Sequence, residues 1–101
     1  MQINIDTSVQ KFIQSLEELT IAKILRTIDL LEKFGNKLGM PHAKIVSIKL
    51  LELRIRGKQE IRIFYCFRNN SIYLIHGFTK KSQKTPHKEL QNAMKKFDLL
   101  T

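Results

Sequence analysis

Three arginines in the second half of the chain could hold a phosphate group. Arg54 and Arg56 alternate with apolar residues in the segment LLELRIRG, and Arg62 stands in the next apolar segment, IRIFYCF. The planar guanidinium group of arginine can grip two phosphate oxygens at once and stabilise charge that develops on them. The alternative is a solvated strand face or a salt bridge to Glu52 or Glu60, and the residues alone favour that alternative. The alternation places Arg54 and Arg62 away from the apolar side chains, so we expect both to be exposed.

The stretch HGFTKKSQKTP, residues 76–86, adds three lysines and no carboxylate. Like charges close together disfavour the protonated form of an amine, so Lys80 or Lys81 could exchange a proton with a reacting oxygen. Simple attraction of phosphate by all three lysines, including Lys84, explains the composition equally well. The sequence leaves the choice between these two roles open.

His76 adjoins these lysines, and a histidine can take part in acid–base chemistry near neutral pH. Its place in the strand alternation matches Ile72 and Leu74, which instead predicts a packed, hydrogen-bonded side chain on their face of the sheet. His42 and His87 lie in a predicted loop and at a predicted helix start, without the spacing of metal ligands. We therefore expect no metal site and no cofactor.

The net charge of +9 is concentrated in the second half of the chain. Residues 1–50 carry seven Lys or Arg against five Asp or Glu, whereas residues 51–101 carry eleven against four. Such a surface favours a polyanionic partner, because each neutralised phosphate releases counterions, although a surface that only solubilises the protein would give the same count. The chain has no P-loop and no paired carboxylates near these cations, so ATPase and two-metal nuclease functions lack their required groups.

Composition predicts one folded domain over residues 1–101, because 43% of the residues are hydrophobic and 27% are charged. Cys66 is the only cysteine, which excludes an intrachain disulfide, and its apolar surroundings predict a buried thiol in a reducing compartment. The sequence shows no signal peptide and no apolar run of about 18 residues that could span a bilayer. We expect a cytoplasmic protein with no membrane partner.

The first half of the chain predicts a short strand followed by a helical hairpin. Residues 2–5 (QINI) predict the strand. Apolar residues recur at helical spacing over residues 9–16 and again over residues 21–31, and Gly35 is a natural stop for the second helix. Residues 35–44 (GNKLGMPHAK) then predict a loop.

The second half predicts an antiparallel meander and a final helix. The segments LLELRIRG, IRIFYCF and SIYLIHGF alternate apolar and polar residues or are rich in β-branched and aromatic types, and the turn signals GKQE and RNNS separate them. Thr85 is predicted to cap the last helix and Pro86 to open it. The expected fold is α+β, with the order β-α-α-β-β-β-α.

The segment from LLELRIRG to KKSQKTPHKEL resembles the phage-derived, HigB-like branch of the RelE toxin superfamily. Proteins of that branch carry an ELR strand, an R-x-x-Y strand, a hydrophobic strand that ends in HGF or HHF, and KKxxKTP before a helix. All four elements stand here in order over residues 50–90. Leu51 takes the place of an aromatic residue, often Trp, that commonly precedes ELR.

The resemblance implies a RelE-like domain that is the toxin of a type II toxin–antitoxin system. Such toxins are metal-free endoribonucleases that cut mRNA, usually on the translating ribosome. An antitoxin, often a helix-turn-helix protein, neutralises them. Because the RNA supplies its own 2′-hydroxyl as the nucleophile, we expect products with 2′,3′-cyclic phosphate ends.

The resemblance and the cation pattern together select the candidate site. The expected catalytic residues are Arg54, Arg62, Lys80 and Lys81. The expected RNA-binding residues are Arg56, Lys58, Lys84 and His76. Two alternatives keep the fold without catalysis: a gyrase inhibitor of the ParE type, which generally lacks this array of cations, and a noncatalytic nucleic-acid-binding module.

Overall fold

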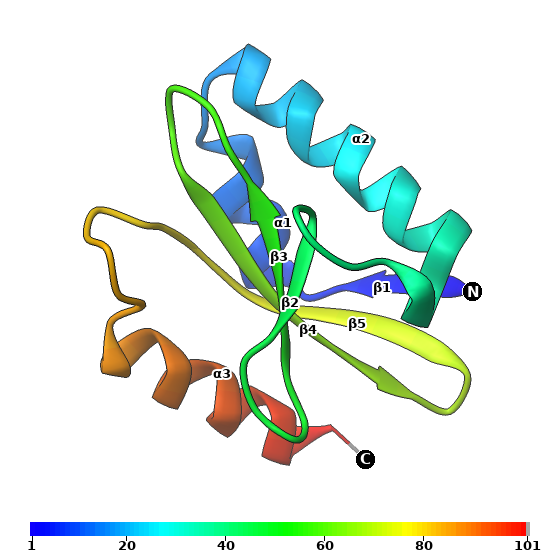
Figure 1. The fold of residues 1–101 in the computed structure, drawn as a ribbon. Helices are drawn as coiled ribbons and strands as arrows, with labels where there is room; N and C mark the ends of the chain where they lie inside the picture. The colour runs from blue at the N-terminus through cyan, green and yellow to red at the C-terminus, as the bar shows by residue number, and fades with distance from the viewer. Residues whose placement is uncertain (101) are drawn as a thin grey trace.

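One five-stranded sheet separates two helices on one face from a third helix on the other (Figure 1). The computed structural model describes residues 1–100. The elements in chain order are β1 (Gln2–Ile5), α1 (Thr7–Gln14), α2 (Glu18–Phe34), η1 (Gly35–Lys37), β2 (Ala43–Ile45), β3 (Leu51–Ile55), β4 (Ile61–Arg68), β5 (Ser71–Thr79) and α3 (His87–Leu99). The predicted α+β class is confirmed. Over residues 1–100, no helix combines the length and the apolar character that crossing a membrane requires.

The predicted meander forms the centre of the sheet, whose strand order is β1-β5-β4-β3-β2. Strand β4 pairs antiparallel with both β3 and β5. Strand β1 adds to one edge, parallel to β5, and β2 adds to the other edge, antiparallel to β3. The turn predicted at RNNS is confirmed: Asn69 and Asn70 have φ values of 52° and 62°, the left-handed conformation that asparagine tolerates in tight hairpins.

Strand β2 corrects the prediction of a loop over residues 35–44. Ala43–Ile45 pairs with β3 and places Lys44 opposite Glu52. Three residues are too few to show a reliable alternation, and their strand conformation depends on the free backbone groups at the edge of β3. The pairing therefore brings a lysine of the predicted loop onto the sheet.

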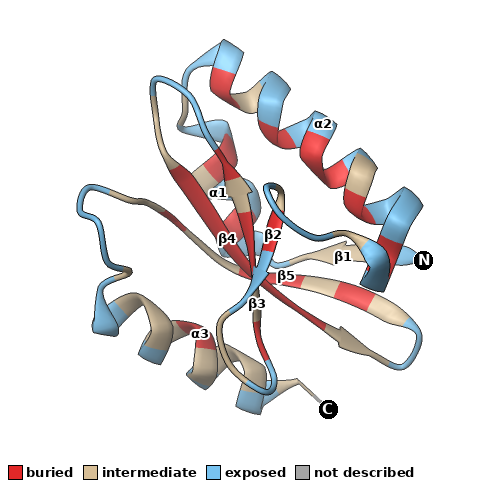
Figure 2. Ribbon diagram, in the orientation of Figure 1, coloured by how far each residue is buried: buried red, intermediate tan, exposed pale blue. Residues whose placement is uncertain are grey.

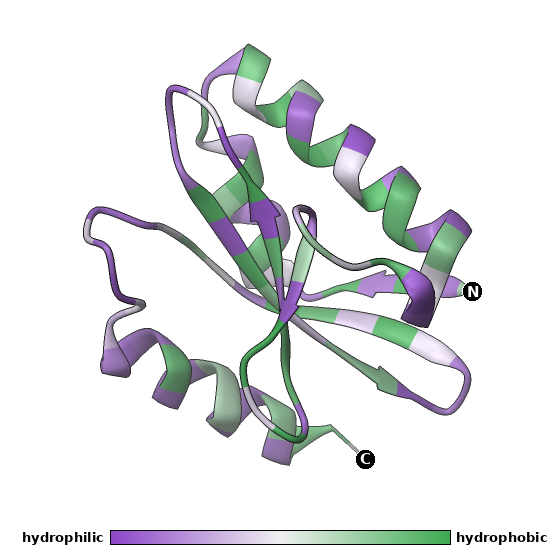
Figure 3. Cartoon of the chain, in the orientation of Figure 1, coloured by the Kyte–Doolittle hydropathy of each residue, from purple (hydrophilic) through white to green (hydrophobic). Residues whose placement is uncertain are grey.

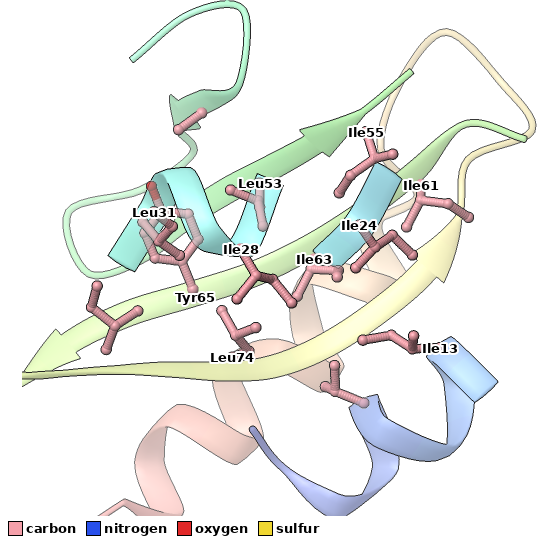
Figure 4. Packing of buried hydrophobic residues seen from close by; sticks show 13 residues of the cluster. Ile13, Ile24, Ile28, Leu31, Leu53, Ile55, Ile61, Ile63, Tyr65 and Leu74 are labelled. Carbon is pink, nitrogen blue, oxygen red and sulfur yellow. The ribbon is translucent and has the colours of Figure 1, made fainter. Parts of the chain in front are cut away.

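Two apolar clusters hold the helices against the sheet. The larger cluster lies between the sheet and the pair α1 and α2, and Figure 4 shows 13 of its buried residues. The smaller cluster lies under α3 and includes Phe64, Cys66 and Phe78. Fully burying an Ile or Leu side chain contributes about 1.5–3 kcal/mol to stability. Because the cluster under α1 and α2 buries more such side chains than the cluster under α3, most of the apolar stabilisation lies on the side of α1 and α2 (Figure 2). Cys66 is buried as predicted, and burial raises the pKa of its thiol.

A β-bulge in the β4–β5 pair changes the face on which His76 lies. Phe64 pairs with His76, but the next residue of β4, Tyr65, pairs with Leu74, so Ile75 is an extra residue in β5. The bulge shifts the alternation by one position, and His76 shares the face of Phe64. The prediction that His76 shares the face of Leu74 is therefore wrong.

Gly77 allows α1 to pack closely against β5. A Cβ atom at Gly77 would lie 2.7 Å from Phe12 Cδ2 and 3.1 Å from Phe12 Cε2. We expect Gly77→Ala to lower the free energy of unfolding by about 1–3 kcal/mol, as measured by urea denaturation, because Phe12 must move within a packed cluster. The matched control is Gly39→Ala, where an added Cβ meets no atom within 4 Å of the described chain. The control should change stability by less than about 0.5 kcal/mol, and equal effects would contradict close packing at Gly77.

Candidate functional site

A cross-strand pair of arginines lies at the centre of the candidate site. Arg54 of β3 is directly opposite Arg62 of β4. Like charges in this position repel each other, and Glu52 lies between them: its Oε1 atom is 3.2 Å from Arg62 Nε and 3.6 Å from Arg54 Nε. Glu52 is 3% exposed and Arg62 is 2% exposed. The expectation that both arginines are exposed is therefore wrong: Arg62 is buried and Arg54 is partly buried.

The donors of Arg62 are largely used by the protein itself. Its Nη2 atom lies 3.2 Å from Glu60 Oε1, and its Nη1 atom donates to the carbonyl oxygen of Ile61 at 2.9 Å. Together with Glu52, these contacts occupy the guanidinium group on several sides. The salt bridges to Glu52 and Glu60, raised above as the alternative to phosphate binding, are what the structure shows.

Arg54 differs from its partner because its contacts are looser. Its side chain is 11% exposed, and apart from Glu52 its polar contact is to Met40 Sδ, 3.4 Å from Nη1. Burial, together with the nearby charges of Arg62 and Arg56, lowers the pKa of Arg54. An anion arriving here would offset that repulsion, so Arg54 is the member of the pair suited to bind phosphate.

Glu52 also connects this arginine pair to the segment before α3. Thr85 Oγ1 donates to Glu52 Oε2 at 3.3 Å. The prediction that Thr85 caps the last helix is wrong, because α3 begins at His87 and Pro86 holds the N-cap position without a side-chain hydrogen bond. The Thr85 hydroxyl group therefore donates to the buried carboxylate of Glu52 and does not cap α3.

The lysine loop, residues 80–86, leaves the sheet beside the β3–β4 turn (Figure 1). The Lys80 backbone N–H donates to the carbonyl oxygen of Glu60 at 2.7 Å, which joins the two segments. Both segments are hydrophilic (Figure 3). Among residues 1–100 no carboxylate forms an ion pair with the exposed or half-exposed cations of these segments, which are Arg56, Lys58, Lys80, Lys81 and Lys84. The structure thus brings five free cations to one end of the sheet.

A hollow of about 330 Å³ lies beside this cluster, between β2 and the start of α3. Its lining residues are Lys44, Ile45, Val46, Phe64, Thr85, His87 and Leu90. Lys44 and His87 are exposed, so the hollow offers an amine and an imidazole above apolar walls. Sequence reasoning missed both: Lys44 stood in a predicted loop, and His87 was considered only as a metal ligand, although it directly follows the lysine loop.

His76 supports α3 from the sheet. Its Nε2 atom lies 2.8 Å from Glu89 Oε1, and its ring stacks against both Phe64 and Phe78 at centroid distances of 6.3 and 6.1 Å. The packed, hydrogen-bonded role predicted for His76 is confirmed, on the opposite face from the one expected. An additional role in RNA binding stays a prediction.

The described residues suit acid–base and electrostatic chemistry. Residues 1–100 contain no group of three or more His, Cys, Asp or Glu side chains placed to hold a metal ion. Arg54 and the free cations can bind and stabilise an anionic group, and the lysines and His87 can exchange protons near it. The arrangement could therefore position a phosphodiester and assist a nucleophile that the substrate itself supplies.

Removing Arg62 should destabilise the protein. Arg62→Ala leaves Glu52 buried without its nearest cation, and an unpaired buried charge costs about 3–5 kcal/mol. We expect the lower part of that range in urea denaturation, because Arg54 remains near Glu52. The control Arg56→Ala removes an exposed cation and should change stability by less than about 0.5 kcal/mol. Equal stabilities for the two variants would show that the ion pair does not support the fold.

Glu60 should make stability depend on pH. Burial alone would raise the pKa of its carboxyl group, but hydrogen bonds from the Gly57 N–H and Arg62, with the charges of Arg62 and Arg56, lower it below the ordinary value of 4.5. Such a group contributes stability above its unfolded pKa and loses that contribution as pH falls through its folded pKa. Below about pH 4.5 the wild type should therefore lose stability more steeply than Glu60→Gln in acid unfolding. Parallel curves would contradict this assignment.

Comparison with known protein families agrees with the RelE part of the resemblance. The model that matches is "Phage derived protein Gp49-like (DUF891)", and it covers residues 11–98. That range includes the arginine pair, Glu52, the lysine loop and His87. The family is associated with RelE-like toxins. The comparison with curated proteins finds no match. The match spans most of the domain and the whole candidate site, so this chain belongs to the Gp49-like family of phage-derived, toxin-like proteins.

Proposed function

We propose that this chain is the toxin of a type II toxin–antitoxin system and a HigB-like, metal-independent endoribonuclease that cleaves mRNA on the translating ribosome. The observation that carries this proposal is the cluster of free cations at one end of the sheet, next to Arg54. Within residues 1–100 none of these free cations forms an ion pair with a carboxylate, which suits a polyanionic substrate, and membership of a family associated with RelE-like toxins supports the same conclusion. The partner that neutralises such a toxin is an antitoxin, for which we propose a helix-turn-helix protein.

In the proposed reaction the RNA strand lies across the arginine pair and the lysine loop. The 2′-hydroxyl oxygen attacks the adjacent phosphorus, the bond to the 5′-oxygen breaks, and a 2′,3′-cyclic phosphate and a 5′-hydroxyl result. Arg54, Lys80 and Lys81 stabilise the additional negative charge on the phosphate oxygens. Arg62 keeps Glu52 in place and acts on the phosphate only through Arg54.

Two protons must move in this reaction. One leaves the 2′-hydroxyl group and one reaches the departing 5′-oxygen. Lys80, Lys81 and His87 are the proposed groups: the lysines lie at the end of the sheet that carries the free cations, and His87 lines the neighbouring hollow. Arg56, Lys58 and Lys84 hold flanking phosphates.

The burial of Arg62 favours a second candidate function. A catalytic cation must reach the substrate, and Arg62 is enclosed by Glu52 and Glu60. A ParE-type gyrase inhibitor needs no such access, because it acts by binding. An assay of DNA supercoiling by gyrase separates this candidate from the nuclease.

Substitutions at Arg54 and at the free lysines should greatly reduce cleavage without unfolding the protein. Arg54→Ala removes a charge-stabilising donor, which elsewhere contributes about 2.7–4 kcal/mol, so cleavage of translated mRNA should fall about a hundredfold or more. The double variant Lys80→Ala with Lys81→Ala should show a similar loss. Arg54→Lys keeps the charge beside Glu52 but lacks the two-pronged grip, and its activity should lie between Arg54→Ala and wild type.

Thermal melting of each variant and the cleavage rate of Lys33→Ala are the controls, since Lys33 lies on α2, outside the site. Wild-type cleavage should persist in EDTA and yield 2′,3′-cyclic phosphate ends. Full activity of folded Arg54→Ala would show that the proposed site is wrong, and inhibition of gyrase by the same protein would establish the second candidate.

A further inference from the structure

A second basic hollow lies beside the candidate site, between α2 and the end of β3. Its volume is about 260 Å³, and its walls carry Lys23, Arg26, His42, Arg54 and Arg56. These residues come from three segments far apart in the sequence: α2, the chain before β2, and the end of β3. No carboxylate lines the hollow within the described residues 1–100. Only the tertiary structure brings these cations together.

A backbone contact holds Lys23 of α2 beside the end of β3. Lys23 Nζ donates to the carbonyl oxygen of Arg56 at 3.4 Å. A Cβ atom at Gly57 would lie 2.5 Å from Lys23 Nζ, so the glycine leaves room for the ammonium group over the β3–β4 turn. Arg26 stands three residues after Lys23, on the same side of α2. Lys23 is therefore held at the hollow by a contact to the backbone, and Arg26 lies beside it on α2.

Four permanent cations around one hollow repel each other, and a bound anion would offset that repulsion. Three of them are arginines, whose donor geometry matches the oxygens of a phosphate group. Arg54 belongs both to this hollow and to the Glu52 cluster, so the hollow is continuous with the proposed cleavage site. A phosphate bound here could belong to the same strand that is cleaved.

We propose that this hollow binds a backbone phosphate of the RNA strand at a position away from the scissile bond, with Lys23 and Arg26 as its principal ligands. The inference rests on the proposed endoribonuclease function and assigns to that function two residues of α2. Their role is to set the register of the strand: a phosphate fixed at α2 limits which phosphodiester reaches Arg54. His42 adds a hydrogen-bond donor at the rim.

The test uses a short single-stranded RNA with 2′-O-methyl groups, which lacks the nucleophile and so reports binding alone. In Lys23→Gln with Arg26→Gln, the contact to one backbone phosphate is lost, and the log–log salt slope of binding should fall in magnitude by about 0.7. Both positions are exposed, so the melting temperature should match wild type. The matched control, Lys11→Gln with Lys33→Gln, loses the same charge outside the hollow and should keep the wild-type slope.

The outcomes separate this inference from the proposed function. If the α2 double variant and the control have equal slopes while wild type binds and cleaves RNA, the hollow is not a phosphate site and the function stands. If wild type fails to bind the oligonucleotide, the inference about the hollow is overturned, whereas the proposed function is overturned only if wild type also fails to cleave translated mRNA. Inorganic phosphate is the second arm: if it raises the melting temperature of wild type but not of the α2 variant, with RNA slopes unchanged, the hollow takes a free anion. A glutamate-rich peptide that displaces RNA from wild type but not from the α2 variant would assign the hollow to an acidic protein segment instead.

Discussion

The buried carboxylate of Glu52 is the interaction on which the functional face depends. Its Oε1 atom forms ion pairs with Arg62 Nε at 3.2 Å and with Arg54 Nε at 3.6 Å, and its Oε2 atom accepts a hydrogen bond from Thr85 Oγ1 at 3.3 Å. Two unit charges about 4 Å apart interact by about 4 kcal/mol at the effective dielectric of a protein surface, so two facing arginines need a counter-charge of this kind. One carboxylate thus holds β3, β4 and the segment before α3 in a fixed relation.

That interaction divides the cations into those that build the site and those that face solvent. Arg62 is enclosed by two carboxylates and a carbonyl oxygen, so its ion pairs and hydrogen bond stabilise the fold rather than bind a ligand. Arg54 shares the same carboxylate but keeps part of its guanidinium group accessible. Lys81 and Lys84 are exposed on their loop. Positive charge therefore stabilises the structure at Arg62 and is available to attract a ligand at the loop lysines.

The two faces of the sheet differ in how much apolar surface they bury. The face under α1 and α2 is filled with apolar side chains and supplies most of the burial. The face under α3 is only partly apolar, and the pair formed by His76 and Glu89 holds the helix at the boundary between the apolar cluster and the charged end of the sheet. Because α3 leaves that end uncovered, the hollow next to Phe64 and the lysine loop stay accessible.

Short-range patterns in the sequence determined the helices, the central strands and the hairpin turn. The period of two in LLELRIRG places Leu53 and Ile55 in the core, and the asparagines of RNNS make the hairpin turn, because each signal lies within a few consecutive residues. The lysine-rich, carboxylate-free composition of residues 76–86 likewise identified one end of the site. The order and type of the helices and of the central strands followed from the same signals.

Tertiary structure alone decided the burial of Arg62, the face of His76 and the gathering of Lys23 and Arg26 beside Arg54. Alternation cannot show whether a polar side chain meets water or a carboxylate from the next strand, and the bulge at Ile75 reverses the alternation without leaving a signal in the sequence. Strand β2 and the second hollow require partners that are distant along the chain. Contacts between distant residues depend on how the whole chain packs, and a local pattern holds no information about that packing.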